Sequence, residues 1–295
     1  MKRTIVMAGL VAGFSMFSAA QPAKVLKSDA ISAEGQENYE LAAENYEKAA
    51  KVFLEQNVTD TVCIYRAGYN YFRIKSYEKA VPLLKECISL GYNLSGCYRM
   101  LGDAREARGD HQQAETAFLK GRETVPEDEA DFDRQLAYLY FNTGQYEKAA
   151  ARFGRLDSIS PGTADYMYLH GFSLERIHRY REAMDVLKRM EELFPDDKRA
   201  KKIYGVAFLG ETEMRNEAEV KRYNSKKDAK LKDYIGTKKT LDRISVDYEK
   251  ARVMLEASLQ DFPGDRLVAA SLYRAYKKQS NEAGMERMRK MLGKK

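Results

Sequence analysis

The stretch from Tyr98 to Pro126, YRMLGDAREARGDHQQAETAFLKGRETVP, decides the fold of this 295-residue chain. Apolar residues in each half recur at intervals of three and four, the spacing of one face of an amphipathic helix. Gly109 suits a turn between the two halves, and Asp110 suits the N-cap of the second. Pro126 ends the second half, since proline cannot continue a helix. The stretch therefore predicts two antiparallel helices.

The same pattern recurs along the chain at a fixed period. The alanine of the second helix stands at positions 80, 114, 149 and 183, so the intervals are 34, 35 and 34 residues. Before each alanine, in the first helix, stands a small residue, and after it, in the second helix, a large apolar one. The small residues are Gly68, Gly102, Ala137 and Gly171, and the large ones are Leu84, Phe118, Phe153 and Leu187. Such periods are typical of arrays in which each helix pair buries its apolar face against the next.

These units resemble the tetratricopeptide repeat family, whose pattern of Leu-Gly-x2-Tyr, Ala-x3-Phe and a final proline has a 34-residue period. We interpret residues 61–197 as four such repeats and residues 21–60 as a degenerate N-terminal helical repeat. Residues 198–263 match more loosely, as a degenerate, basic region, and residues 264–295 are predicted to be a C-terminal capping helix pair. The resemblance implies an all-α fold, a right-handed superhelical solenoid of antiparallel helix pairs.

The rear of the chain departs from the period and from the charge of the front. Ile203-Tyr204-Gly205 looks like a normal first helix, but the next good second helix, around Ala251, comes 34 residues later than expected. Segment 214–247 is therefore either a degenerate repeat, which we favour, or an inserted, extended helical hairpin. Residues 198–295 carry 25 Lys and Arg against 14 Asp and Glu, whereas the remainder carries 25 against 30. This asymmetry indicates either an interaction surface or an ordinary solvated lysine-rich surface.

Residues 1–20 have the layout of a cleavable secretory signal. Lys2 and Arg3 precede an apolar run that ends near Phe17, and small residues lead up to Ala20. The run is shorter than the roughly 20 residues that a membrane-spanning helix needs, so we favour cleavage after Ala20 over a permanent anchor. We expect export to the bacterial periplasm, with secretion or envelope attachment as alternatives, and no integral membrane segment after cleavage. Nucleic acid is not an expected partner of an exported protein.

The family resemblance also implies a binding surface. In this family, ligands are held by first-helix residues that lie three before, one after and four after the small residue. Carried onto this chain, these positions form a concave groove rich in Tyr and Phe, which offer large, rigid contact areas; alternatively, some of them pack against neighbouring first helices. The implied binding residues are Tyr65, Tyr69, Phe72, Arg99, Asp103, Arg134, Tyr138, Phe141, Tyr168 and Phe172, with Glu106 and Glu175 at two further positions.

No catalytic, metal or cofactor motif is recognisable in the sequence. There is no nucleophile elbow, phosphate-binding loop or His-Glu-x-x-His motif, and His170 and His178 have no partner spaced to complete a metal site. We therefore expect a non-enzymatic interaction scaffold of the bacterial cell envelope that binds partner proteins or peptides in the aromatic groove. The alternative is a glycan- or peptidoglycan-binding module that uses the same groove, because aromatic faces also stack on sugar rings.

The three cysteines are Cys63, Cys87 and Cys97. An oxidising compartment permits a disulfide. The chain reverses between Cys87 and Cys97, so these two can meet, whereas Cys63 lies one helix spacing away, roughly 10 Å, and a disulfide needs Cα atoms within about 7 Å. We predict that any disulfide joins Cys87 to Cys97 and leaves Cys63 free; the alternative is that all three stay reduced.

Overall fold

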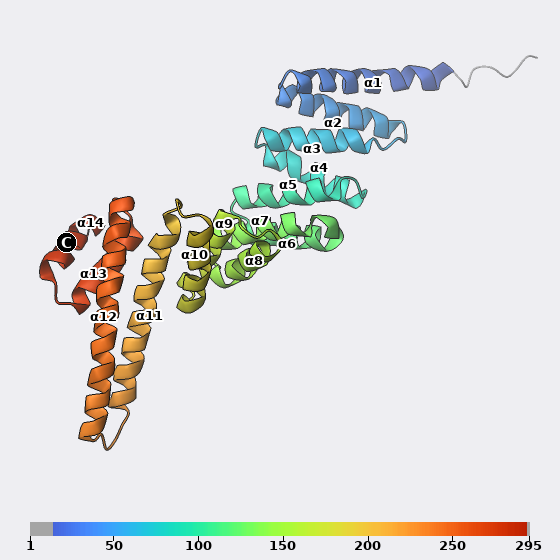
Figure 1. Cartoon of the computed structure of the whole chain (residues 1–295). Coiled ribbons are helices and arrows are strands. Elements are labelled where there is room, and N and C mark those ends of the chain that lie inside the picture. Colours follow the sequence, from blue (N-terminus) through green and yellow to red (C-terminus); the bar gives the residue numbers. More distant parts are fainter. Residues whose placement is uncertain (1–13, 294–295) are drawn as a thin grey trace, which may run out of the picture. The chain divides into compact units, whose positions relative to one another are not determined.

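The computed structural model describes residues 14–293, with side chains from residue 22 onward. Within that range the chain is all-α, with fourteen α-helices, one 3₁₀ helix (η1, Pro126–Asp128) and no strand (Figure 1). The helices follow one another in pairs. These are α1 (Phe14–Gly35) and α2 (Tyr39–Glu55), α3 (Thr61–Arg73) and α4 (Tyr77–Ser89), α5 (Leu94–Ala107) and α6 (His111–Thr124), α7 (Glu129–Asn142) and α8 (Tyr146–Ile159), α9 (Ala164–Arg176) and α10 (Tyr180–Leu193), α11 (Arg199–Asn224) and α12 (Leu231–Asp261), and α13 (Arg266–Lys278) and α14 (Glu282–Leu292).

The predicted helical solenoid is confirmed, and the four strong repeats correspond to α3 through α10. Within a repeat, the small residue of the first helix lies against the large residue of the second. A Cβ placed on Gly102 would lie 2.2 Å from the Phe118 ring, and one on Gly171 would lie 2.6 Å from Leu187. Only glycine permits approaches this close, so the spacing of small and large residues reflects direct packing of the two helices.

The turn predictions for the stretch from Tyr98 to Pro126 are confirmed in part. Gly109 has a φ of +78°, a left-handed conformation that glycine adopts without steric cost. Asp110 occupies the N-cap position of α6, but its side chain makes no capping hydrogen bond. It pairs instead with Arg105, at 3.4 Å between Nη1 and Oδ2. Pro126 follows the end of α6 and opens η1.

The chain forms two compact units, which among the described residues comprise 14–139 and 140–293. In each unit, some first helices of successive pairs contact one another. The contacts join α3 to α5 in the first unit, and α9 to α11 and α11 to α13 in the second. First helices therefore share one side of each unit, which we call the first-helix face, and second helices share the other, the second-helix face.

Segment 214–247 corrects one prediction. It does not form a degenerate repeat, because α11 and α12 run through it as one hairpin of 26 and 31 residues with a turn at 225–230. Only Thr237 and Ile244 are buried between residues 214 and 247. The segment therefore does not pack as an extra helix pair on a neighbouring repeat, and it lengthens the two helices of the existing pair. The predicted helix pair at residues 264–295 is present as α13 and α14.

The described residues include only the last part of the predicted signal segment. Residues 1–13 of the predicted signal lie outside the described residues, and α1 begins at Phe14 and continues through the predicted cleavage position. Ala23, Ala30 and Ala33 of α1 belong to a buried cluster with residues of α2 and α3. Among the described residues, no helix has the length and apolar character required to cross a membrane. Cleavage after Ala20 stays a prediction.

All three cysteines are buried and present as free thiols. Burial raises the pKa of Cys63 to about 12. Interaction with the Cys97 thiol lowers the pKa of Cys87, and interaction with Cys87 together with burial raises the pKa of Cys97. The two cysteines expected to meet are therefore adjacent, while formation of the disulfide itself stays a prediction.

Candidate binding surfaces

The ten predicted binding residues are all half-buried. They come from α3, α5 and α7 in the first unit and from α7 and α9 in the second. A half-buried aromatic side chain is held by its neighbours on one side and presents contact area on the other. The two units are described in turn.

In the first unit, four tyrosines and one arginine form what we call the tyrosine row. Tyr65 and Tyr69 lie four residues apart on α3 and stack, with ring centroids 6.3 Å apart and planes at 25°. Tyr92, in the turn before α5, packs edge-on against Tyr65 at 5.7 Å. Arg73 donates hydrogen bonds to the hydroxyls of Tyr69 (3.2 Å) and Tyr39 (2.9 Å), and its guanidinium lies 4.2 Å from the Tyr39 ring. The row therefore combines flat apolar faces with one fixed cation.

Phe72, the third predicted residue of α3, packs apart from this row. Its ring centroid lies 5.8 Å from that of Tyr77, the first residue of α4. Phe72 therefore packs between the two helices of one repeat. The alternative to a binding role that the sequence left open was packing against a neighbouring first helix.

Charged side chains continue the first-helix face beyond the tyrosine row. Asp131 forms ion pairs with Arg134, at 2.7 Å on α7, and with Arg99, at 3.4 Å on α5. The carboxylate thus ties two first helices together and fixes two of the predicted arginines. Tyr138 lies one helical turn beyond Arg134 on α7 and is half-buried.

Asp103 lies one turn after Arg99 on α5. Burial raises its pKa to about 6, the negative charge of Glu106 adds to the shift, and the positive charge of Arg99 opposes it. At neutral pH the first-helix face therefore holds a carboxylate with little solvent around it. Such a group can accept a hydrogen bond or a positive charge from a bound molecule.

In the second unit, four rings form what we call the aromatic cluster. The Phe172 centroid lies 5.4 Å from that of Phe141, 6.1 Å from that of Tyr146 and 6.2 Å from that of Tyr168. Cations cover both tyrosines, with Arg176 at 5.7 Å from the Tyr146 ring and Arg199 at 5.0 Å from the Tyr168 ring. The predicted residues Phe141, Tyr168 and Phe172 are thus brought into one group.

Glu175 lies beyond the aromatic cluster on α9. It is buried, and burial raises its pKa. Its Oε2 atom makes no hydrogen bond within the described structure. The nearest compensating charges come from Arg176 and from Arg274 on α13, and Arg274 is itself paired with Glu213 at 3.0 Å. The stretch of face between α9 and α13 therefore carries charges of both signs, in contrast to the aromatic cluster.

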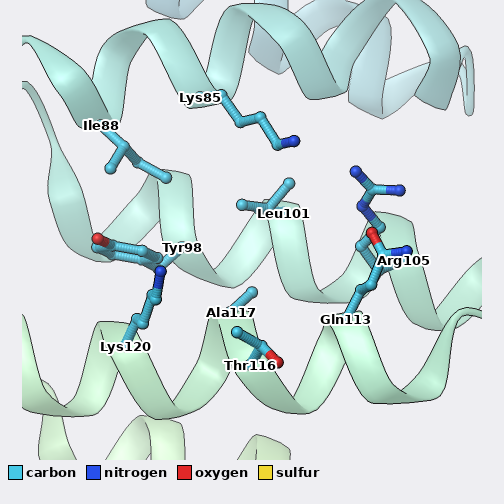
Figure 2. Close-up of a pocket in the computed structure, with 9 residues that line it drawn as sticks. All are labelled: Lys85, Ile88, Tyr98, Leu101, Arg105, Gln113, Thr116, Ala117 and Lys120. Atoms are coloured by element: carbon cyan, nitrogen blue, oxygen red, sulfur yellow. The ribbon is translucent and has the colours of Figure 1, made fainter.

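Three pockets of similar size lie on the second-helix face. Figure 2 shows the first, of about 320 Å³, where Lys85 and Ile88 of α4, Leu101 and Arg105 of α5 and Lys120 of α6 surround an open space. Equivalent pockets of about 330 Å³ and 410 Å³ lie between α2 and α4 and between α10 and α12. None of the ten predicted residues lines these three pockets. These three pockets therefore lie apart from the predicted binding residues.

Two of the histidines in the described part of the chain lie in a packed position and in a turn. No group of three or more His, Cys, Asp or Glu side chains is placed to hold a metal ion there. His170 packs against Gly154, and burial lowers its pKa, so the ring is held neutral inside the array. His178 hydrogen-bonds the Tyr180 hydroxyl at 2.6 Å in the turn after α9.

Residues outside the predicted set complete both aromatic groups. Tyr92 lies in an inter-repeat turn, and Tyr146 opens a second helix, so a rule confined to first helices omits both. Arg73 could have been found from its spacing, because it falls four residues after Tyr69 and shares its helix face. Tyr39 and Arg199 come from neighbouring repeats, and only the stacking of the array brings them in.

Replacing Asp103 with asparagine is expected to stabilise the protein at pH 8 and not at pH 4. The folded-state pKa of about 6 exceeds the ordinary value of 3.8, so the folded state holds the proton more tightly than the unfolded state. The wild-type free energy of unfolding therefore falls as pH rises from about 4 to 6, and the loss persists above that range. The asparagine variant does not undergo this loss. At pH 8 its free energy of unfolding should therefore exceed that of the wild type by about 1–2 kcal/mol, after allowance for partial solvent exposure. Urea unfolding at both pH values measures the difference.

The matched control is Asp131→Asn, which removes a carboxylate paired with two arginines. It should lower stability at pH 8, where Asp103→Asn raises it. An equal gain for Asp103→Asn at pH 4 and pH 8 would contradict the raised pKa.

Comparisons with known proteins agree with the geometry. A tetratricopeptide repeat family model matches residues 63–90, and a model described as anaphase-promoting complex, cyclosome, subunit 3 matches residues 110–190. No curated protein matches the chain. These matches support membership of the tetratricopeptide repeat family, and no catalytic family is indicated.

Solved structures show the same fold at low sequence identity. The MamA protein is 21% identical with a TM-score of 0.50, covering 61% of this chain and 95% of that one. YrrB, described as a tetratricopeptide repeat protein with an unusual peptide-binding site, is 20% identical with a TM-score of 0.50 and coverages of 64% and 97%. A tetratricopeptide repeat protein from Parabacteroides merdae is 11% identical with a TM-score of 0.51 and coverages of 86% and 99%. At such identities the likeness concerns the fold alone.

Proposed function

We propose that this chain is a non-enzymatic scaffold of the bacterial cell envelope that binds partner proteins or peptides along its first-helix face. The observation that carries the proposal is the pair of aromatic groups, the tyrosine row and the aromatic cluster. Each combines half-buried rings with guanidinium groups set against them. Tyr and Arg are enriched among the residues that dominate protein interfaces.

The surface suits a peptide or protein better than a small molecule. Tetratricopeptide repeat proteins generally mediate contacts between proteins, and the similar YrrB is described as having a peptide-binding site. The aromatic groups lie on a contact face and not in the pockets described above. An extended or helical segment can contact several rings of such a face, whereas a small ligand needs a concave site that surrounds it.

The polar groups of the face favour a partner that carries basic residues next to apolar ones. In the first unit, burial raises the pKa of the Asp103 carboxyl group, and in the second unit the Oε2 atom of Glu175 makes no hydrogen bond within the described structure. A lysine or arginine of the partner would compensate these carboxylates, while its apolar side chains cover the rings.

The envelope location rests on the N-terminal sequence. The basic start, apolar run and small residues of positions 1–20 are those of a secretory signal. Cleavage after Ala20 would leave Pro22 in the first turn of the shortened α1. Proline suits that position, because an amide at the start of a helix has no partner to lose. The packing residues Ala23, Ala30 and Ala33 would be retained.

The test starts with crosslinking and purification of partners from native envelopes, followed by affinity measurements with a purified partner. Tyr69→Ala, Tyr138→Ala and Phe172→Ala are each expected to weaken binding by more than about 1 kcal/mol, with helical content unchanged. The matched control is Tyr204→Ala, which removes a half-buried tyrosine from the second-helix face, where Tyr204 lines a pocket. Its affinity should equal that of the wild type.

Two results would contradict the proposal. One is normal partner binding by all three first-helix variants, and the other is loss of binding only with loss of helical content. Glycan or peptidoglycan binding is the second candidate, because exposed ring faces also suit sugars. Retention on isolated, protein-free cell-wall material that depends on the same three side chains would favour it.

A further inference from the structure

The inserted hairpin ends in a surface that the rest of the chain does not use. We call residues 221–239 the hairpin tip: the end of α11, the turn and the start of α12. In Figure 1 the joined ends of α11 and α12 extend beyond α13 and α14 of the same unit. The core that these four helices share reaches only to Leu209 on α11 and Ile244 on α12 among its buried members. Between residues 213 and 243 only Thr237 is buried, where Arg222 hydrogen-bonds it at 3.2 Å.

The hairpin tip is strongly basic. It contains eight Lys and Arg residues and two Asp residues. Arg222 pairs with Glu219, and Lys226 pairs with Asp233 at 2.6 Å. In the described structure no ion pair involves the other lysines of the tip, which are Lys221, Lys227, Lys230, Lys232, Lys238 and Lys239. All six lysines are exposed, so the tip presents a net positive charge to solvent.

The same tip exposes large apolar side chains. Leu231, Tyr234 and Ile235 are 74%, 51% and 57% exposed. Leu231 and Ile235 lie four residues apart on α12, so they share one helix face, and Lys238 continues that face. Thr237 points instead to α11, as its contact with Arg222 shows. The apolar side chains thus lie on the outer side of the hairpin, where nothing in the described chain covers them.

We propose that the hairpin tip docks on the surface of an anionic lipid bilayer. Leu231 and Ile235 would enter the interfacial region, Tyr234 would lie at the headgroup level that tyrosine prefers, and the lysines would contact lipid phosphates along their flexible stems. Apolar insertion and a polybasic patch are the two contributions that together give stable attachment of a peripheral protein.

The composition of the tip favours a bilayer over other polyanions. Protein interfaces are depleted of lysine and enriched in arginine, whereas seven of the eight cations here are lysines. Nucleic-acid contacts would use the positive charges but would leave Leu231 and Ile235 exposed to water. A bilayer surface accounts for both the charges and the apolar side chains. This surface is separate from the first-helix face, so the inference does not depend on the proposed function.

The test uses sedimentation of the full chain with vesicles. One set contains equal amounts of phosphatidylcholine and phosphatidylglycerol, and the other contains phosphatidylcholine alone. Binding is expected to the anionic vesicles only and should weaken as salt is raised, because ions screen the lysines. Lys227, Lys230, Lys238 and Lys239 changed together to Gln should weaken binding at least tenfold. Leu231→Ser combined with Ile235→Ser should weaken it by a similar factor.

Matched controls separate the hairpin tip from general charge and apolarity. Lys188, Lys201, Lys277 and Lys290 changed together to Gln remove the same charge elsewhere in the unit. Val253→Ser removes an exposed apolar side chain of α12 outside the tip. Both variants should bind anionic vesicles as the wild type does.

A fluorescent variant reports the insertion directly. The chain contains no tryptophan, so Tyr234→Trp introduces a single reporter at the tip. Its emission should shift to shorter wavelength with anionic vesicles, and that of Tyr273→Trp on α13 should not. The proposal is overturned if anionic vesicles are not bound, if neutral vesicles are bound equally, or if the tip variants bind as the wild type does. It is also overturned if a single-stranded nucleic acid competes fully and the Leu231 and Ile235 changes have no effect.

Discussion

Replacing Phe118 with alanine is expected to lower the free energy of unfolding by about 3–5 kcal/mol, the cost of truncating a buried phenylalanine. Phe118 is fully buried in α6, and its ring lies against the backbone of α5 at Gly102. The ring fills the space that glycine leaves open, so its removal creates a cavity between the two helices of one repeat. Urea unfolding followed by circular dichroism measures the loss through the transition midpoint.

The neighbouring residue provides the control. Leu119 is one position further along α6 and is 37% exposed, so Leu119→Ala removes a side chain that folding covers only in part. Its cost should be well below that of Phe118→Ala. Similar losses for the two variants would show that the repeat is not held together by packing of Phe118 on Gly102.

Replacing Gly102 with alanine is expected to cost about 1–3 kcal/mol, the usual range for overpacking a core. Alanine is the better helix former by about 1 kcal/mol, so without a clash the change would stabilise α5. A Cβ at this position would lie 2.2 Å from the Phe118 ring, however, and Phe118 is enclosed on all sides. The steric cost therefore exceeds the gain in helix propensity. Thermal and urea unfolding of the full chain show whether Gly102→Ala lowers or raises the stability.

Two further variants make this prediction specific. Gly236 is a helical glycine in α12 with no atom within 4 Å of a Cβ placed on it, so Gly236→Ala should stabilise by about 0.5–1 kcal/mol. In a chain that already carries Phe118→Ala, the clash at residue 102 is gone. Gly102→Ala should then be neutral or favourable, so the two changes are strongly non-additive. Additive losses would refute the contact.

The sequence could predict the fold because the residues that pack against each other lie within the same repeat. Gly102 and Phe118 lie 16 residues apart, within one helix pair, and their sizes are complementary. The inserted segment carries no comparable pair. A polar stretch one repeat in length can form two new helices or extend two existing ones. The repeat period is the same in both cases and does not distinguish them. The outcome depends on burial, and only Thr237 and Ile244 are buried there.

The candidate surface could be predicted in its positions but not in its surroundings. The family rule for first helices identified Tyr65, Tyr69 and Phe172, which do take part in the two aromatic groups. It could not indicate that Tyr92 of an inter-repeat turn packs against Tyr65. Nor could it give the burial of Glu175, because the nearby charge of Arg274 comes from a helix about a hundred residues later in the chain. Side-chain partners that come from distant repeats can be identified only from the three-dimensional stacking of the helices.

The local character of the helix contacts also has a consequence for how the chain acquires its structure. Apart from contacts between first helices two elements apart, the helices of each unit pack on their immediate neighbours in sequence. Proteins dominated by such contacts have low contact order and fold quickly, because little loop-closure entropy must be overcome. A helix pair can therefore form as soon as its own residues and those of the preceding pair emerge from the ribosome or from a translocation pore. The array then grows in the direction of synthesis or export and never has to wait for its C-terminal cap.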